Sequence, residues 1–254
     1  MNLKQLFESL YLKFNKKEFV NPDPLIFLYD YENIKDREII GLIASTLAYG
    51  RVAQILASVK KIVEPMGKSP YDFVMSHKKR ELEKKYDGFK HRFTVSDEIV
   101  NLLTGIKSGI AEYKNLENLY LSGVDNFVKF LNNSQKSYLL PAPADGSACK
   151  RLNLYFRWMI RKDEVDPGGW DKCSKKELLI PLDTHMFKIA KMVQFTKRNS
   201  ADFKAVKEIT ERFAEISPDD PVKYDFSLTR LGIRDDASFD ELTSFLKQNQ
   251  LNSF

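Results

Sequence analysis

The segment ELLIPLDTHMFKIAKMV, residues 177–193, joins an apolar run to an amphipathic helix. The apolar run ends at Pro181, and apolar residues then recur at helical spacing from 184 to 193. Asp183 stands alone at the junction, where aspartate is a favoured helix cap and is also a carboxylate available for chemistry. The residues therefore leave two roles open for Asp183: a cap with no other task, or a catalytic group.

Helical periodicity continues on both sides of this segment and predicts an all-α protein. No alternating apolar and polar run bounded by turns indicates a sheet, and the chain has no internal repeat. Helices are predicted over residues 3–14 and 36–48, from the turn at 49–50 to 64, and over 94–113, 123–132, 147–162, 184–193, 200–216, 219–231 and 238–247.

Composition is that of an ordinary globular protein. The 254 residues are 43% hydrophobic and 30% charged, enough for one large domain or two lobes. The net charge of +5 is a mild basic bias that permits a polyanionic partner. Two cysteines and three scattered histidines are too few for a four-thiolate zinc or iron–sulfur site, so no metal or cofactor is expected.

The N-terminal residues 1–14 are amphipathic and lack the apolar core of a secretory signal. No apolar run approaches the roughly 20 residues that a membrane span needs. We therefore expect a soluble, cytoplasmic protein.

The helix predicted over 147–162 has an unusual row of cations. Lys150, Arg157 and Arg161 fall on one stripe, with Arg151 beside it. Lys150 lies in the first helical turn, where the helix N-terminus and neighbouring arginines lower the pKa of an amine. A lysine of that kind is a candidate nucleophile. The plainer alternative is a solvated basic face on a surface helix.

Four segments together resemble the helix–hairpin–helix DNA glycosylase superfamily, and "PLDTH" (181–185) is the most specific of their motifs. The segments are "DREIIGLIASTLAYGRVAQILASVKKIV" (36–63), "DEIVNLLTGIKSGIAEY" (97–113), "IPLDTHMFKIAKMVQF" (180–195) and "DPVKYDFSLTRLG" (220–232). With "CKRLNLYFRWMIR" (149–161), the chain resembles more closely an uncharacterised bacterial family, DUF2400, that is grouped with this superfamily.

The resemblance implies a two-lobed, all-α fold with a central cleft. Residues 36–162 would form the lobe with the basic helix, and residues 1–35 plus 163–254 the lobe with the Asp183 helix. Asp183 matches the catalytic aspartate of the superfamily, and Lys150 is the best candidate for the lysine of its glycosylase/lyases. Two departures stand out: "PAPADGSACK" (141–150) replaces the hairpin Leu-Pro-Gly-Val-Gly, and the cysteine cluster of the iron–sulfur branch is missing.

The implied function is base excision from damaged duplex DNA, with an oxidised purine such as 8-oxoguanine as a candidate lesion. A flipped base needs an aromatic-lined pocket, and phosphates need cations. The pocket candidates are Tyr49, Tyr155, Trp158 and His185, and the nucleic-acid-binding candidates are Arg92, Arg151, Arg157 and Arg161.

Alternatives remain open on the residues alone. Lys150 is equally well placed to contact a phosphate, His185 suits packing better than catalysis, and Trp158 suits the core. At the level of the whole chain, the rivals are a nucleic-acid-binding protein without catalysis, an enzyme acting on glycosidic bonds of RNA or nucleosides, and a structural helical protein.

Overall fold

The computed structural model describes residues 2–234 and 238–248, and it is mostly helical, as the sequence predicts. Short 3-10 helices are η1 (Lys17–Phe19), η2 (Pro24–Asp30), η3 (Glu64–Met66), η4 (Pro143–Asp145) and η5 (Lys175–Glu177). The α-helices are α1 (Leu3–Phe14), α2 (Ile34–Thr46), α3 (Val52–Val63), α4 (Pro70–Ser76), α5 (Lys79–Lys85), α6 (Ser96–Tyr113), α7 (Leu116–Leu121), α8 (Val124–Leu131), α9 (Lys150–Ile160), α10 (Thr184–Met192), α11 (Phe203–Ile216), α12 (Asp225–Ile233) and α13 (Asp240–Gln248).

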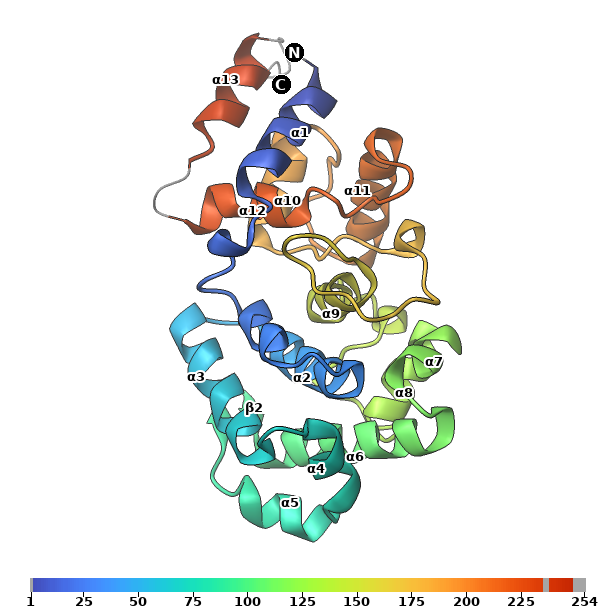
Figure 1. Ribbon diagram of the computed structural model, residues 1–254. Helices are drawn as coiled ribbons and strands as arrows, with labels where there is room; N and C mark the ends of the chain where they lie inside the picture. The colour runs from blue at the N-terminus through green and yellow to red at the C-terminus, as the bar shows by residue number, and fades with distance from the viewer. Residues whose placement is uncertain (1, 235–237, 249–254) are drawn as a thin grey trace.

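Helix α9 lies between two groups of helices (Figure 1). Helices α2–α8 form the lower group in that view, and α1 with α10–α13 the upper group. Helix α2 packs against α9 and η2, while α1 packs against α12. The N-terminal helix therefore completes the group formed by the last helices of the chain.

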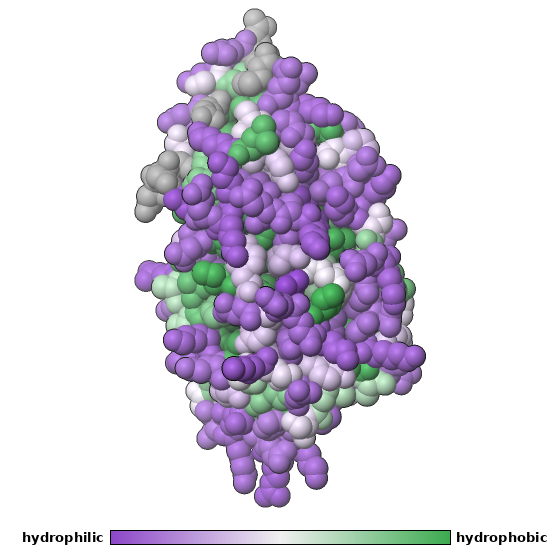
Figure 2. Space-filling model, in the orientation of Figure 1, coloured by the Kyte–Doolittle hydropathy of each residue, from purple (hydrophilic) through white to green (hydrophobic). Residues whose placement is uncertain are grey.

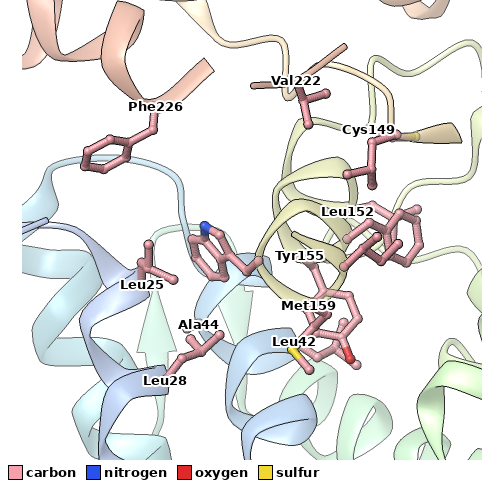
Figure 3. Packing of buried hydrophobic residues seen from close by; sticks show 14 of the residues in the cluster. Leu25, Leu28, Leu42, Ala44, Cys149, Leu152, Tyr155, Met159, Val222 and Phe226 are labelled. Atoms are coloured by element: carbon pink, nitrogen blue, oxygen red, sulfur yellow. The ribbon is translucent and has the colours of Figure 1, made fainter. Parts of the chain in front are cut away.

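Buried side chains of other elements pack against helix α9 on nearly all of its sides. Tyr155 and Met159 of α9 are fully buried and lie near Leu28 and Leu42 (Figure 3). Trp158, on a different side of the helix, is also fully buried. Burial of each large apolar side chain contributes roughly 1.5–3 kcal/mol, so α9 is anchored by packing on several faces.

Helices α9, α11 and α12 begin three or more residues later than the sequence predicts. Helix α9 starts at Lys150 rather than 147, because Cys149 has a left-handed backbone with φ 48°. Helix α11 starts at Phe203, where the Asp202 side chain caps it. Helix α12 starts at Asp225 rather than 219, because Asp220 lies in a turn and pairs with Arg161 instead of opening a helix.

A small hairpin of β1 (Lys90–His91) and β2 (Thr94–Val95) was not predicted. Each strand has only two residues, too few to produce an alternating pattern in the sequence. Arg92 turns the chain with φ 53°, and the hydroxyl of Tyr49 donates to the Thr94 hydroxyl at 2.7 Å. The hairpin is thereby fixed against the turn between α2 and α3.

Candidate active site

Asp183 caps helix α10. The buried residues Ile180–Leu182 lead into the helix, and one Asp183 carboxylate oxygen accepts a hydrogen bond from the backbone N–H of Met186 at 2.7 Å. The side chain is only partly buried, and it lines a cavity. Asp183 therefore caps α10 through its side chain, and this hydrogen bond holds its carboxylate in a fixed position at the cavity wall.

Lys150 is the first residue of α9, and its ammonium donates to the backbone oxygen of Ala48 at 3.2 Å. Burial lowers the pKa of this lysine, although the carboxylates of Asp183, Asp23 and Asp225 oppose that effect. The direction is the one expected from the sequence, but the cause differs, since loss of hydration outweighs repulsion by neighbouring arginines. A partly buried amine of this kind is more readily deprotonated than a surface lysine.

Lys150 and Asp183 line the same cavity of about 650 Å³. It lies where α9 and the α2–α3 turn meet the start of α10 and the end of α12. A smaller cavity of about 90 Å³ shares several of its lining residues, Lys150 and Asp183 among them. The charged residues that line the smaller cavity are Asp23, Lys150, Arg157, Asp183, Asp225 and Arg230.

Two of the predicted pocket residues line the larger cavity. Tyr49 lies on its α2–α3 side, and His185 lies on its α10 side. His185 sits tightly against Gly232 of α12, where a β-carbon would come within 2.3 Å of the imidazole Nδ1. Glycine at 232 is thus needed for α10 and α12 to approach each other.

The other two pocket candidates line neither of these two cavities. Tyr155 and Trp158 are fully buried on α9, so the expectation that they line a base pocket is not supported by their positions. Within residues 2–234 and 238–248, the Tyr155 hydroxyl and the Trp158 indole nitrogen have no hydrogen-bond partner. The sequence could not show that α9 is enclosed on its polar stripe as well as on its apolar face.

Arg157 and Arg161 also differ from the expectation of phosphate contact, because both guanidinium groups are buried in ion pairs. Arg157 pairs with Asp166 at 3.1 Å and with Asp225. Arg161 pairs with Asp166, with Asp220 at 3.0 Å and with Asp163. Burial disfavours their charge, but these carboxylates outweigh it and raise the pKa of both arginines. The acids come from the loop after α9 and from the turn before α12 or its first residue, a pairing that helical spacing does not reveal.

Arg92 is exposed, whereas Arg151 is only partly exposed and its guanidinium donates to the backbone oxygens of Thr46, at 3.0 Å, and Tyr138. The Arg151 guanidinium lies over the rings of Tyr49 at 4.8 Å and Tyr138 at 4.7 Å. Arg92 lies 5.5 Å from the ring centroid of Phe93, at the tip of the β1–β2 hairpin. We call Arg92, Arg151, Tyr49, Phe93 and Tyr138 the arginine–aromatic cluster.

Phe93 and Tyr138 were missed by sequence reasoning. They are 68% and 50% exposed, and their rings contact each other with centroids 5.8 Å apart. The only sequence signal was Phe93 beside Arg92 in "FKHRF", and nothing pointed to Tyr138. Exposed aromatics next to arginines are typical of surfaces that bind unstacked bases.

Apolar surface gathers near the junction of the two helix groups on the face in Figure 2, and most of the remaining face is hydrophilic. A separate cavity of about 370 Å³ lies on the other side of α9, between α7, α8 and the start of α11. Its walls include Tyr120, Phe156 and Phe203, and it contains none of the candidate catalytic residues. Lys150 and Asp183 therefore define the candidate site.

Within residues 2–234 and 238–248, no group of three or more histidine, cysteine or carboxylate side chains is arranged to hold a metal ion. Over the same ranges, no helix is both long and apolar enough to cross a membrane.

Residues 23–234 match the sequence model of one protein family, described as "Protein of unknown function (DUF2400)". The match covers most of the chain, which therefore belongs to this family. Neither a curated protein nor a solved structure matches the chain.

Proposed function

We propose that this member of the DUF2400 family is a base-excision DNA glycosylase with lyase activity, in which Lys150 is the nucleophile and Asp183 the catalytic carboxylate. The proposal rests on one observation: an amine with a lowered pKa and a helix-capping carboxylate line the same cavity of about 650 Å³. Asp183 lies in a segment that resembles the glycosylase superfamily, and Lys150 lies in the segment that resembles the DUF2400 family.

The chemistry follows from these two groups. The neutral amine of Lys150 attacks C1′ of the sugar and displaces the base, while the Asp183 carboxylate stabilises the oxocarbenium-like transition state. Opening of the sugar leaves a Schiff base between C1′ and Lys150. Loss of the C2′ proton then breaks the DNA strand by β-elimination.

The proposed fold is the two-lobed glycosylase arrangement, with residues 36–162 as one lobe and residues 1–35 plus 163–254 as the other. Helix α9 contributes Lys150 from one side of the cavity, and α10 contributes Asp183 from the other. The cavity is large enough for a flipped nucleotide, given that small-ligand sites span roughly 300–1,000 Å³.

The DNA would reach the site past the arginine–aromatic cluster. Arg92 and Arg151 would neutralise phosphates, and Phe93 and Tyr138 would stack on bases that the flipped nucleotide leaves unpaired. Tyr49 belongs both to this cluster and to the cavity wall, so it joins the binding surface to the reaction site. An oxidised purine such as 8-oxoguanine is our first candidate for the excised base.

The second candidate function is nucleic-acid binding without catalysis. The cap on α10 is a sufficient structural reason for an aspartate at 183, and "PAPADGSACK" lacks the hairpin glycines whose amides hold a phosphate in the superfamily. This function would use the arginine–aromatic cluster and leave Lys150 and Asp183 without chemical roles.

The two functions are separated by a base-release assay. Duplexes with 8-oxoguanine, uracil or an oxidised pyrimidine are incubated with the protein, and released base is measured by mass spectrometry beside binding by fluorescence anisotropy. Glycosylase function predicts release from at least one duplex by the wild type and none by Asp183→Asn, with equal binding by both. Binding without release from any duplex, RNA oligonucleotide or nucleoside would establish the second function.

A further inference from the structure

Asp225 is a buried carboxylate whose bonding is incomplete. It is the first residue of α12, is 3% exposed, and pairs through one oxygen with Arg157. Its other oxygen, Oδ1, is buried and has no hydrogen-bond partner among the residues that the structure describes. Buried polar atoms are nearly always paired, because an unpaired one carries an unrecovered desolvation cost. An unpaired carboxylate oxygen next to a reactive site therefore calls for a chemical explanation.

Asp225 lines the smaller cavity of about 90 Å³ that Lys150 also lines. Lys150 lines the larger cavity as well, whereas Asp225 does not, so DNA in the larger cavity would meet Lys150 and not Asp225. The other charged groups that act on the pair come from each surrounding element: Asp23, Arg151, Arg157, Asp166, Asp183 and Arg230.

Burial brings the pKa values of Lys150 and Asp225 closer together. It lowers the pKa of Lys150 and raises the pKa of Asp225 to about 6, the latter despite the opposing charge of Arg157. In water the pKa of a lysine ammonium is several units higher than that of an aspartate carboxyl, so the proton stays on the lysine. Here the difference between the two pKa values is smaller, so transfer of a proton from the lysine to the aspartate costs less free energy.

We propose that Asp225 is a positioning residue for Lys150: it accepts the proton that the lysine must lose to become a nucleophile. The inference rests on the proposed function. The two groups are not in direct contact, so the proton moves from the ammonium to Asp225 Oδ1 through water in the cavity that both residues line. Its transfer frees the nitrogen electron pair to form a bond with C1′ of an abasic-site aldehyde. The aldehyde oxygen leaves as water and takes the stored proton back by way of the Lys150 nitrogen. The products are the iminium and the original carboxylate, so atoms and charge balance.

The first test is the pH profile of Schiff-base formation, measured by borohydride trapping on a duplex with an abasic site. The wild-type rate should rise through about pH 6, where Asp225 ionises, and then level off. Asp225→Asn keeps the size and one acceptor oxygen but cannot take the proton. It should lose this rise and, although its Lys150 is more often neutral, react about tenfold more slowly at pH 7, because no acid returns the proton that the leaving oxygen needs.

Asp220→Asn is the matched control, because Asp220 is also a buried partner of an arginine, Arg161, but lines neither cavity. It should lose stability and keep the wild-type pH profile. A rise near pH 6 that persists in Asp225→Asn, or a rate lowered equally at every pH, would overturn the proposal in favour of a purely structural role.

A second measurement needs no DNA and separates failure of this inference from failure of the proposed function. Reductive methylation requires a neutral amine, so its extent at Lys150, measured by peptide mass spectrometry at several pH values, reports the pKa of that lysine. Removal of the Asp225 charge should lower that pKa and speed methylation at pH 7 by about tenfold. Equal profiles in wild type and Asp225→Asn would refute the pairing even if the enzyme forms a Schiff base. A shifted profile without trapping would support the pairing and reject the lyase.

Discussion

Lys150 and Asp183 line one cavity from two helices that the long loop 161–183 separates in sequence. The lysine opens α9 and the aspartate caps α10, so each is held by the end of a helix. A site built on helix ends is more rigid than one built on loop tips, which is what orientation of a nucleophile and a carboxylate requires.

The two roles of Asp183 can be separated by two substitutions. Asparagine caps helices as well as aspartate does, so Asp183→Asn should leave the free energy of unfolding nearly unchanged and abolish base release. Asp183→Ala should lose activity and also about 1 kcal/mol of stability, because the Met186 N–H loses its acceptor. Urea unfolding and base release on both variants provide the comparison. Full activity in Asp183→Asn would leave the residue as a cap only.

The buried ion pairs of α9 should dominate its stability. Replacement of Arg157 by methionine leaves Asp225 buried without its cation and Asp166 with Arg161 alone, and should cost about 3–5 kcal/mol of unfolding free energy. Lys176→Met is the control, because Lys176 and Asp219 form an exposed pair, which solvent and salt screen. Similar losses in the two variants, measured by urea unfolding, would show that the buried network is not the anchor of α9.

Glu38 should make stability depend on pH. Burial raises the pKa of this carboxyl from 4.5 to about 7, against the hydrogen bonds from Leu116 and Trp170. The folded state therefore binds the proton more tightly than the unfolded state. This contribution is complete below about pH 4.5 and is lost as the pH rises through 7, a change of about 3 kcal/mol.

Glu38→Gln removes this titration, so its unfolding free energy should fall less than that of the wild type between pH 5 and pH 8. Glu64→Gln, at an exposed position, should behave as the wild type. Unfolding by urea at the two pH values measures both. Parallel pH dependence in Glu38→Gln and wild type would contradict the assignment.

The arginine–aromatic cluster should contribute to DNA binding in two distinguishable ways. Arg92→Ala should lower the slope of log affinity against log salt by about 0.9, the value for one lost phosphate contact. Phe93→Ala should weaken binding by about 1–3 kcal/mol at every salt concentration and leave the slope unchanged. Leu12→Ala, an exposed apolar residue on α1, is the control. Anisotropy titrations in which Phe93→Ala and Leu12→Ala bind equally well would exclude stacking by Phe93.

The sequence predicted the class of fold because helical periodicity is a local property. It also predicted which residue caps α10, since Asp183 precedes an amphipathic run directly. What it could not predict is pairing across the chain. Arg157 and Arg161 lie on a polar stripe that looks solvated, and only the fold brings Asp166, Asp220 and Asp225 to them.

The same limit applies to the site. Lys150 could be singled out by its helix position, but the carboxylates around it come from η2, α10 and α12, far apart in sequence. Tyr138 joins the arginine–aromatic cluster from a loop with no regular pattern. Contacts that depend on tertiary packing leave no periodic signal, so they had to be found in the structure.

The central claim is that Lys150 forms a covalent bond with DNA, and borohydride trapping followed by peptide mapping tests it directly. The protein is mixed with duplexes that carry an abasic site or 8-oxoguanine, reduced, digested and analysed by mass spectrometry. We predict a nucleotide adduct on Lys150, its loss in Lys150→Ala, and its persistence in Lys188→Ala, an exposed lysine on α10. A duplex that binds the protein but yields no adduct on Lys150 would contradict the account.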